Sequence, residues 1–264
     1  MLSAQNLHLT FNPGTPIETQ ALRGMSLDIP AGQFVTVIGS NGAGKSTFLN
    51  AISGEQTVDS GVILIDGEDV TQQPVWDRAR KVARVFQDPM AGTCENLTIE
   101  ENMSLALGRG QFRSLRQAVR EEMRVLFRER LAMLGLGLES RLTDRIGLLS
   151  GGQRQAVSLL MAALRPSRIL LLDEHTAALD PRTAQFVLDL TVRIVAEHGL
   201  TTMMVTHSMR QALDVGDRTV MLHQGRVVLD VAGDTRRGLE VPDLLAMFEK
   251  VRGEELADDS LLLG

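Results

Sequence analysis

A glycine-rich segment that directly follows an apolar run constrains this chain most strongly. The segment GSNGAGKST, at residues 39–47, matches the pattern G-x-x-x-x-G-K-[ST] and follows the apolar run FVTVIG at residues 34–39. This pattern builds a phosphate-binding loop between a buried strand and a helix, so we expect a helix from about Lys45. A glycine-rich turn with an accidental lysine is the alternative, and the agreement of pattern and context argues against it.

The residue types of this segment suit the binding of nucleotide phosphates. Glycine lets the backbone wrap around phosphates, and the loop amides and the helix N-terminus supply hydrogen-bond donors. Lys45 adds a full charge near the β- and γ-phosphates of ATP, and the Ser46 hydroxyl is a ligand for Mg²⁺. The expected phosphate-binding residues are Gly39, Ser40, Asn41, Gly42, Ala43, Gly44, Lys45, Ser46 and Thr47.

A second apolar run, within LLLDEHTAALD at residues 170–180, ends in two adjacent acidic residues. Burying two carboxylates at the end of a core strand costs free energy. Beside a phosphate loop, Asp173 is in the position that holds Mg²⁺. Glu174, one residue later, is the expected general base for the attacking water. A pair of capping carboxylates before a turn is the alternative, and it would leave Mg²⁺ without a ligand at a strand end.

Further apolar runs predict an α/β fold. The runs at 34–39, 169–173 and 201–207 are apolar on both faces, which is typical of a central parallel sheet with helices on each side. We expect additional strands at 62–67 and 82–87.

The C-terminal half contains a predicted hairpin and a predicted helix. The stretch RTVMLHQGRVVLDV should form a hairpin that turns at Gln224-Gly225. Asp180 as N-cap and Pro181 at the first helical position predict a helix that runs to about His198.

The segment from about residue 88 to residue 166 has no convincing strand. Thr98 and Glu101 form a capping box, and apolar residues between 114 and 134 recur at helical spacing. We therefore expect a helical subdomain inserted into the α/β core.

A basic stripe runs along this predicted helix. It consists of Arg116, Arg120, Arg124 and Arg128. Such a stripe is usually a solvated face with acidic partners, here Glu121, Glu122 and Glu129. A contact with anionic lipid or with an acidic partner is the alternative.

The most specific motif is LLSGGQRQA at residues 148–156. Ser150 and Gln153 form a capping box, and Gly151 and Gly152 let an anion approach the backbone. One nucleotide does not need two such anion sites on one chain. We therefore expect a head-to-tail dimer in which each ATP lies between the phosphate loop of one chain and this motif of the other. A helix cap alone is the alternative.

Together these motifs resemble the ATP-binding subunits of ABC transporters, over nearly the entire chain. The shared segments are Walker A (39–47), the Q-loop residue Gln87, the signature (149–153), Walker B (169–174), the D-loop (178–180) and the switch residue His207. The resemblance implies a P-loop NTPase with a RecA-like core and a mixed sheet. It also implies an N-terminal antiparallel β subdomain and an inserted α-helical subdomain.

The resemblance implies roles for further residues. Gln87 would sense Mg²⁺ and water and link the site to the membrane partner, His207 would contact the γ-phosphate, and Asp180 would lie at the dimer contact. Phe11 stands where the family has an adenine-stacking aromatic, although a core aromatic would look the same. The implied catalytic residues are Glu174, His207 and Gln87. The implied metal ligands are Ser46, Gln87 and Asp173. The implied nucleotide contacts beyond the loop are Phe11, Ser150, Gly151, Gly152, Gln153 and Asp180.

The family resemblance also implies one ATP-binding domain over residues 1–264. Its core would span about 1–87 and 167–240, its helical subdomain about 88–166, and a C-terminal helical tail about 241–264.

His175 departs from the family, most of which has proline at this position. Nothing nearby forms a nucleophile–base pair or a metal-ligand cluster, so we expect His175 to support the turn and the position of Glu174 rather than to take part in catalysis. The stretches DEHTAALDP and RVFQDPM resemble a bacterial subgroup of ATPases that is linked to import of tryptophan, tyrosine or unassigned solutes.

Composition restricts the partners. The net charge of −6 argues against a protein that binds nucleic acid by bulk attraction. The single cysteine, Cys94, excludes an internal disulfide and fits a reducing compartment.

No apolar run reaches the roughly 18 residues of a membrane span, and the first residues lack the pattern of a signal peptide. We expect a peripheral protein at the cytoplasmic face of the inner or plasma membrane.

The expected function is an ATPase that powers a bacterial importer of amino acids or a similar small solute. Two copies, or one copy and a homologous subunit, would dock on an integral permease. An extracytoplasmic substrate-binding protein would deliver the solute to this permease. An exporter or a lipoprotein-extraction system is the alternative. Soluble ABC proteins of translation or repair usually have tandem cassettes or a long coiled-coil interruption, and a small-molecule kinase does not need residues 149–153.

Overall fold

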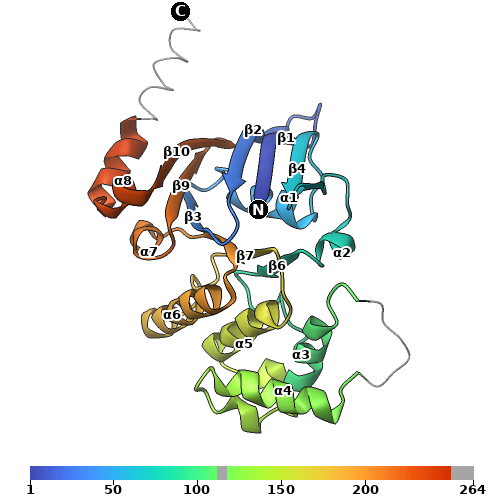
Figure 1. Cartoon of the computed structure of the whole chain (residues 1–264). Coiled ribbons are helices and arrows are strands. Elements are labelled where there is room, and N and C mark those ends of the chain that lie inside the picture. The colour runs from blue at the N-terminus through green and yellow to red at the C-terminus, as the bar shows by residue number, and fades with distance from the viewer. Residues whose placement is uncertain (112–117, 251–264) are drawn as a thin grey trace, which may run out of the picture.

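The computed structural model describes residues 1–111 and 118–250, and its strands form two sheets (Figure 1). The antiparallel sheet has the order β2-β1-β4-β5, with β1 (Leu2–Phe11), β2 (Thr19–Ile29), β4 (Ser60–Ile65) and β5 (Glu68–Asp69). The larger sheet has the order β10-β9-β3-β8-β7-β6, with β3 (Phe34–Gly39), β6 (Val82–Val85), β7 (Ile169–Asp173), β8 (Thr201–Val205), β9 (Arg218–His223) and β10 (Arg226–Ala232).

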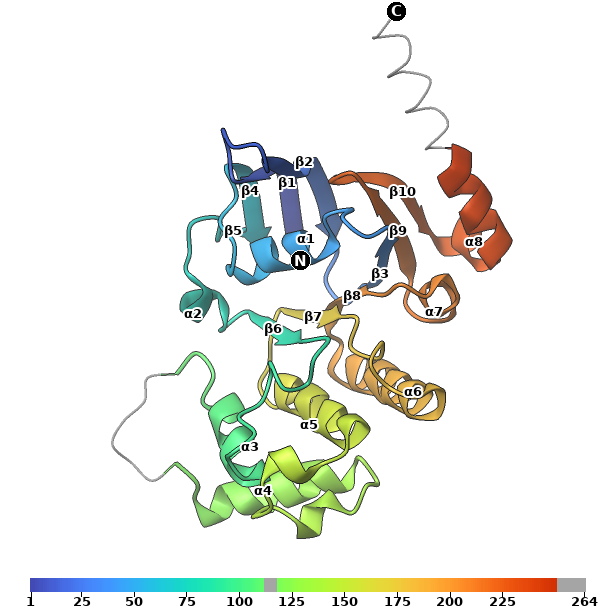
Figure 2. The ribbon, with the colours of Figure 1, turned by 180° about the vertical axis from the view of Figure 1, so that it is seen from behind.

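The α-helices pack against these sheets or against one another (Figures 1 and 2). They are α1 (Lys45–Ser53), α2 (Val75–Arg78), α3 (Ile99–Leu107), α4 (Glu121–Ala132), α5 (Gly151–Ala163), α6 (Pro181–His198), α7 (Met209–Asp214) and α8 (Gly233–Arg237). None of the helices in residues 1–111 and 118–250 is long and apolar enough to cross a membrane.

The larger sheet is mixed, as the sequence predicts. Strands β6, β7, β8, β3 and β9 run parallel, and β10 pairs antiparallel with β9 through the predicted hairpin. Because parallel strands end at the same edge, the loop after β3 and the acids at the end of β7 lie at one edge of the sheet. Only β8 separates β3 from β7. This order brings two distant sequence motifs together.

Each face of the larger sheet contributes to a separate hydrophobic core. In β7, Ile169 and Leu171 join a core that includes α1 and the inner face of the antiparallel sheet. Leu170 and Leu172 join a second core with α3, α4, α5 and α6. The double-sided burial explains the continuous apolar runs. On the first face, α1 shares the cover with the antiparallel sheet, which is the N-terminal β subdomain that the family resemblance implies.

The segment between β6 and β7 is helical within its described residues, as predicted. Thr98 caps α3 with both bonds of the capping box to Glu101. The predicted helix from Ser114 is shorter in the structure, because α4 begins at Glu121 after an extended Arg120 (φ −118°). Residues 112–117 lie outside the described residues, and with them Arg116.

The described arginines of the basic stripe have acidic partners. Arg124 pairs with Glu100 at 2.8 Å and with Glu121 at 3.2 Å, and Arg128 lies 3.6 Å from Glu121. Arg120 lies 3.6 Å from Glu122. The pairs with Glu121 and Glu122 agree with a solvated, charge-balanced face.

Two further contacts hold the end of α1 and part of the C-terminal tail. Arg78 is buried and donates to the carbonyl oxygens of Ala51 and Ile52, which lie in the last turn of α1, so the cation stands at the negative end of this helix. Residues 241–250 are helical, and Leu244 packs with Ile38 and Met221 of the larger sheet. This part of the C-terminal tail therefore packs against the sheet.

Candidate functional site

The phosphate loop connects the end of β3 to the start of α1. Gly39 and Gly44 have positive φ values of 151° and 95°. A Cβ at Gly39 would overlap the carbonyl oxygen of Leu222, and one at Gly44 would lie 2.6 Å from the carbonyl oxygen of Ala21. The loop can follow this path only with glycine at both positions, because the neighbouring backbone leaves no room for a side chain.

Lys45 folds back over the loop that precedes it. Its Nζ donates to the carbonyl oxygens of Gly39 at 2.8 Å and Ser40 at 3.0 Å, and the residue is buried. Burial lowers the pKa of the Lys45 ammonium, while the nearby charges of Glu174 and Asp173 act in the opposite direction. The structure therefore brings the loop lysine and both predicted acids together.

Asp173 ends β7 and has a partner that the sequence did not suggest. Its Oδ2 accepts a hydrogen bond from Nη2 of Arg84 at 2.7 Å. Arg84 is the charged residue in the otherwise apolar run VARVF of β6. A charged residue in a strand that is predicted to be buried requires a partner. That requirement was the signal in the sequence that could have identified Arg84.

Glu174 occupies a left-handed backbone conformation, with φ 46°. Its Oε1 lies 2.6 Å from Nε2 of His207, the residue for which the sequence predicts a phosphate contact. The Glu174 side chain is 8% exposed, whereas that of His207 is 48% exposed. The predicted base and the predicted switch histidine are therefore each other's partners in the structure.

His175 points into the protein. Its Nε2 lies 2.9 Å from Oγ1 of Thr191 in α6, and this hydroxyl donates to the carbonyl oxygen of Val187 at 2.8 Å. Since the single hydroxyl proton goes to Val187, His175 must donate from Nε2 as a neutral ring. Complete burial lowers the pKa of His175 to about 4. The ring therefore braces the turn against α6, in agreement with a supporting role.

The second glycine-rich motif caps α5. The capping box is present, with Ser150 Oγ accepting from the Gln153 amide at 3.3 Å and Gln153 Oε1 accepting from the Ser150 amide at 3.2 Å. A Cβ at Gly152 would overlap the methyl group Cγ2 of Thr183 in α6. The sequence interpretation of Gly152 as space for an anion is therefore incomplete, because this glycine also permits the close packing of α5 on α6.

The two anion-type motifs lie on opposite sides of the larger sheet (Figures 1 and 2). Helix α1, which follows the phosphate loop, packs in the core shared with the antiparallel sheet, whereas α5 packs in the other core. Within one chain, the loop and the capped start of α5 therefore do not form a common site.

The remaining candidates occupy separate positions. Gln87 is exposed after the end of β6, and exposed Asp180 caps α6 by accepting from the Thr183 amide at 3.1 Å. Phe11 is half-buried at the end of β1 and packs against the first core, as a core aromatic does.

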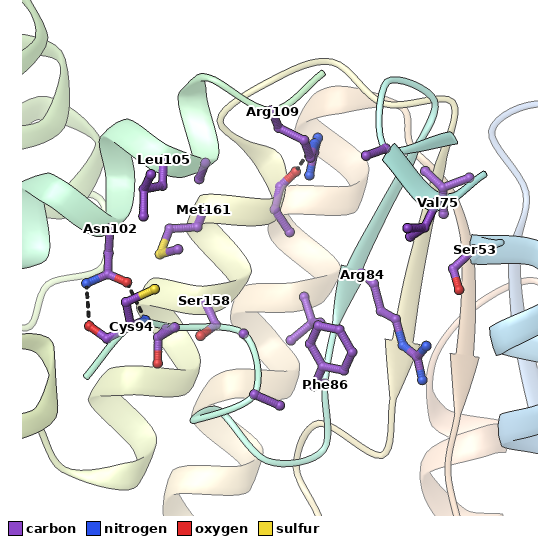
Figure 3. A pocket seen from close by; sticks show the side chains of 18 of the residues that line it. Ser53, Val75, Arg84, Phe86, Cys94, Asn102, Leu105, Arg109, Ser158 and Met161 are labelled. Atoms are coloured by element: carbon purple, nitrogen blue, oxygen red, sulfur yellow. Dashed lines mark hydrogen bonds between the residues drawn. The ribbon is translucent and has the colours of Figure 1, made fainter. Parts of the chain in front are cut away.

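A groove of about 540 Å³ lies beside β6 (Figure 3). Its walls come from the ends of α1 and α2, from the segment after β6, and from α3 and α5. The labelled residues in Figure 3 are Ser53, Val75, Arg84, Phe86, Cys94, Asn102, Leu105, Arg109, Ser158 and Met161. Trp76, at the edge of the groove, is 70% exposed. The groove combines an exposed aromatic surface with a guanidinium group that reaches Asp173.

The oxygen atoms of the site fit a magnesium ion. The Asp173 carboxylate and the exposed Ser46 hydroxyl are hard oxygen donors, which Mg²⁺ binds together with phosphate oxygens and water. Among the described residues there is no group of three or more His, Cys, Asp or Glu side chains that could hold a metal alone.

Comparisons with known proteins agree with the geometry of the site. The family model described as "ABC transporter" matches residues 22–177. A tyrosine transport ATP-binding protein of Clostridioides difficile (strain R20291) is 46% identical over 251 residues, which cover 94% of this chain and 99% of the relative.

Two further matches extend this similarity. An aliphatic sulfonates import ATP-binding protein of Agrobacterium fabrum is 36% identical over 213 residues, or 81% of this chain and 74% of the relative. Among solved structures, a dimeric ATP-binding cassette in a post-hydrolysis state with ADP and phosphate aligns with a TM-score of 0.76. It is 30% identical and covers 90% of this chain and 100% of that chain.

Gly152→Ala tests whether this glycine serves packing. We expect a loss of about 1–3 kcal/mol in the free energy of unfolding, because the added Cβ overlaps Thr183. Adding Thr183→Ser, which removes the overlapping methyl group, should restore most of the loss. Denaturant unfolding of the two single variants and the double variant measures this coupling. If the double variant is no more stable than Gly152→Ala, packing is not what requires glycine here.

His175→Leu tests the buried neutral ring. The folded pKa of His175 is about 4, below the ordinary value of 6.5, so its contribution to stability is present above pH 6.5 and is lost as the pH falls toward 4. Between pH 7 and pH 5 the wild type should therefore lose about 2 kcal/mol more than His175→Leu. Denaturant unfolding at both pH values gives the difference, and equal losses would contradict the assignment.

Proposed function

The chain belongs to the ABC transporter family as an ATP-binding subunit and ATPase, and from this premise we propose that it powers a bacterial importer of amino acids or a similar small solute. The ATPase assignment rests on one observation: Lys45, Asp173 and Glu174 lie together at one edge of the larger sheet. The solute class follows from the tyrosine transport relative, which matches this chain over nearly its whole length.

The proposed active form contains two cassettes, either two copies of this chain or this chain and a homologous subunit. The phosphate loop and the Ser150 motif lie on opposite sides of the larger sheet, so one chain offers two half-sites. A head-to-tail pair would place Ser150, Gly151 and Gln153 of one chain against the phosphates held by the loop of the other. The similarity to a dimeric cassette with ADP and phosphate supports this arrangement.

Within each site, the residues of this chain have distinct proposed roles. Lys45 and the loop amides bind the β- and γ-phosphates, and Phe11 stacks on adenine. Asp173, Ser46 and Gln87 would hold Mg²⁺, which neutralises charge on the phosphate oxygens. Asp180, exposed at the start of α6, lies at the contact between the two cassettes.

Hydrolysis requires Glu174 to act on water. The water oxygen attacks the γ-phosphorus, the bond to the β-phosphate oxygen breaks, and Glu174 accepts the proton from the water. To do so, Glu174 must exchange its bond with His207, which is then free to donate to a γ-phosphate oxygen. Binding of the phosphate would thereby separate the pair of Glu174 and His207.

The proposed partner is an integral permease, to which a substrate-binding protein delivers the solute from outside. The groove beside β6 lies next to the exposed Gln87 and presents Trp76, so it offers a surface for a segment of the permease. We therefore propose that the chain lies at the cytoplasmic face of the membrane. We propose a core of about residues 1–87 and 167–240, which holds the nucleotide, and a helical part of about 88–166, which moves relative to it on closure.

Glu174→Gln tests the base and the dimer together. We expect hydrolysis to fall at least 10²-fold, because the amide cannot accept the proton, while ATP binding persists. Light scattering should then show a dimer with ATP and a monomer without it. Ser150→Arg in the same background is the control, since it should prevent dimer formation and leave ATP binding intact. A Glu174→Gln chain that binds ATP and remains monomeric would falsify the head-to-tail dimer.

Stimulation of turnover tests the proposed solute class. The chain is purified with its membrane partner, reconstituted in vesicles together with the substrate-binding protein, and assayed for ATP hydrolysis against a panel of amino acids. We expect an aromatic amino acid to raise the rate, because the tyrosine transport relative is similar over its full length. Stimulation only by a non-amino-acid solute contradicts the class, and hydrolysis without import contradicts the direction of transport.

A further inference from the structure

The side chain of Arg84 lines the groove (Figure 3). It also contacts Asp173, the acid that ends β7. Strand β6 pairs in parallel with β7, and Arg84 stands opposite Leu171, two residues before Asp173. Its Nη2 donates to Asp173 Oδ2 at 2.7 Å. The two side chains are only 10% and 12% exposed, so solvent screens this pair weakly.

The rest of the guanidinium is held from other directions. Nη1 donates to Asn50 Oδ1 at 2.7 Å and to Glu55 Oε2 at 2.8 Å, and the group lies 4.7 Å from the centroid of the Phe86 ring. Its Nε is buried and has no partner among the described residues. The two carboxylates and the ring thus fix the orientation of Arg84, and this orientation leaves the Nε–H donor without an acceptor among the described residues.

The pair with Arg84 uses one of the two carboxylate oxygens of Asp173. Among residues 1–111 and 118–250, Arg84 makes the only hydrogen bond to the Asp173 carboxylate, and it goes to Oδ2. Oδ1 therefore remains for a cation beside the phosphate loop. The other cation whose charge acts on this acid is Lys45, which is needed for phosphate. Without Arg84, Asp173 would be free to turn toward Lys45.

We propose that Arg84 is a positioning residue for metal binding, which orients Asp173 from the wall of the groove. The proposal rests on the proposed function of the site, since it takes Asp173 as the magnesium ligand. Removal of a group that orients a metal ligand typically weakens metal binding 10–100-fold. Because the same side chain lines the groove, occupancy of the metal site and the state of the groove are coupled through Arg84.

Simple electrostatics predicts the opposite sign for removal of Arg84. A positive charge next to a metal ligand repels the metal, so its loss would strengthen metal binding if charge alone mattered. If Arg84 acts by orienting Asp173, its loss weakens metal binding. The direction of the change therefore distinguishes the two effects.

The experiment titrates Mn²⁺, a paramagnetic probe for the magnesium site, into the full chain with ADP. Free Mn²⁺ is measured by electron paramagnetic resonance, and ADP affinity is measured separately in EDTA. We expect Arg84→Gln to weaken Mn²⁺ binding about tenfold and to leave ADP affinity in EDTA unchanged. Arg84→Lys should lose about threefold, since one ammonium cannot hold two carboxylates in the same geometry.

Arg109→Gln is the matched control. Arg109 lines the same groove but donates to the carbonyl oxygens of Ala162 and Arg165, not to Asp173. Its loss should leave Mn²⁺ affinity unchanged. Unchanged or tighter Mn²⁺ binding in Arg84→Gln overturns the proposal, as does an equal loss in Arg109→Gln. If Arg84→Gln does not fold, Arg84→Lys decides, and wild-type Mn²⁺ affinity in that variant overturns it.

The single cysteine provides a native probe of the coupling. Cys94 is exposed in the groove, so one fluorophore can be attached without further substitutions. Mn²⁺ and ADP should change its emission in the wild type and in Arg109→Gln, but not in Arg84→Gln. Equal responses in all three, or none in the wild type, contradict the coupling. A wild-type chain that binds no nucleotide would instead contradict the proposed function.

Discussion

The structure depends on the compensation of buried charge at the carboxyl edge of the larger sheet. Asp173 and Glu174 end a strand that is buried on both faces, and Lys45 is buried in the loop beside them. Unpaired charges in such a place would be too costly to keep ionised. Each has a partner instead: Arg84 for Asp173, His207 for Glu174, and the loop carbonyls for Lys45. The charged groups of the proposed nucleotide site thus have partners within the chain itself.

The position of these charges follows from the order of the strands. The phosphate loop follows β3 and the acids follow β7, and β8 lies between them. The capped start of α5 belongs to the opposite face, where Gly152 lets α5 approach Thr183 of α6. The same sheet that brings the loop and the acids together therefore separates the loop from the signature motif. A second cassette is the simplest way to give each phosphate both sets of donors.

The sequence predicted the features that depend on local chemistry. The phosphate loop, the capping boxes at Thr98 and Ser150, and the helix from Pro181 to His198 have the expected boundaries, because caps and glycine turns act over a few residues. The hairpin at Gln224-Gly225 is also as expected. The start of α4 is not, because apolar spacing alone does not mark where a helix begins.

What the sequence could not provide are contacts between distant segments. Thr191 as the partner of His175 and Arg84 as the partner of Asp173 lie 16 and 89 residues away in the chain. No local pattern specifies such pairs, although a charged residue in an apolar strand indicates that a partner must exist. The pairing of Glu174 with His207 is of the same kind, and the family resemblance alone suggested a different partner for the histidine.

The two pairings set a free energy against which ligand binding at the site must compete. The bond to His207 engages Glu174, the proposed base. Within residues 1–111 and 118–250, Arg84 bonds to one oxygen of Asp173, which leaves the other for the proposed metal. In the proposed mechanism the first pair breaks for catalysis, whereas the second persists through it. A ligand that separates only the first pair shifts the site toward hydrolysis in proportion to its preference for the separated state. The γ-phosphate is the group of ATP that ADP lacks, so in the proposed mechanism the exchange of the His207 bond distinguishes substrate from product.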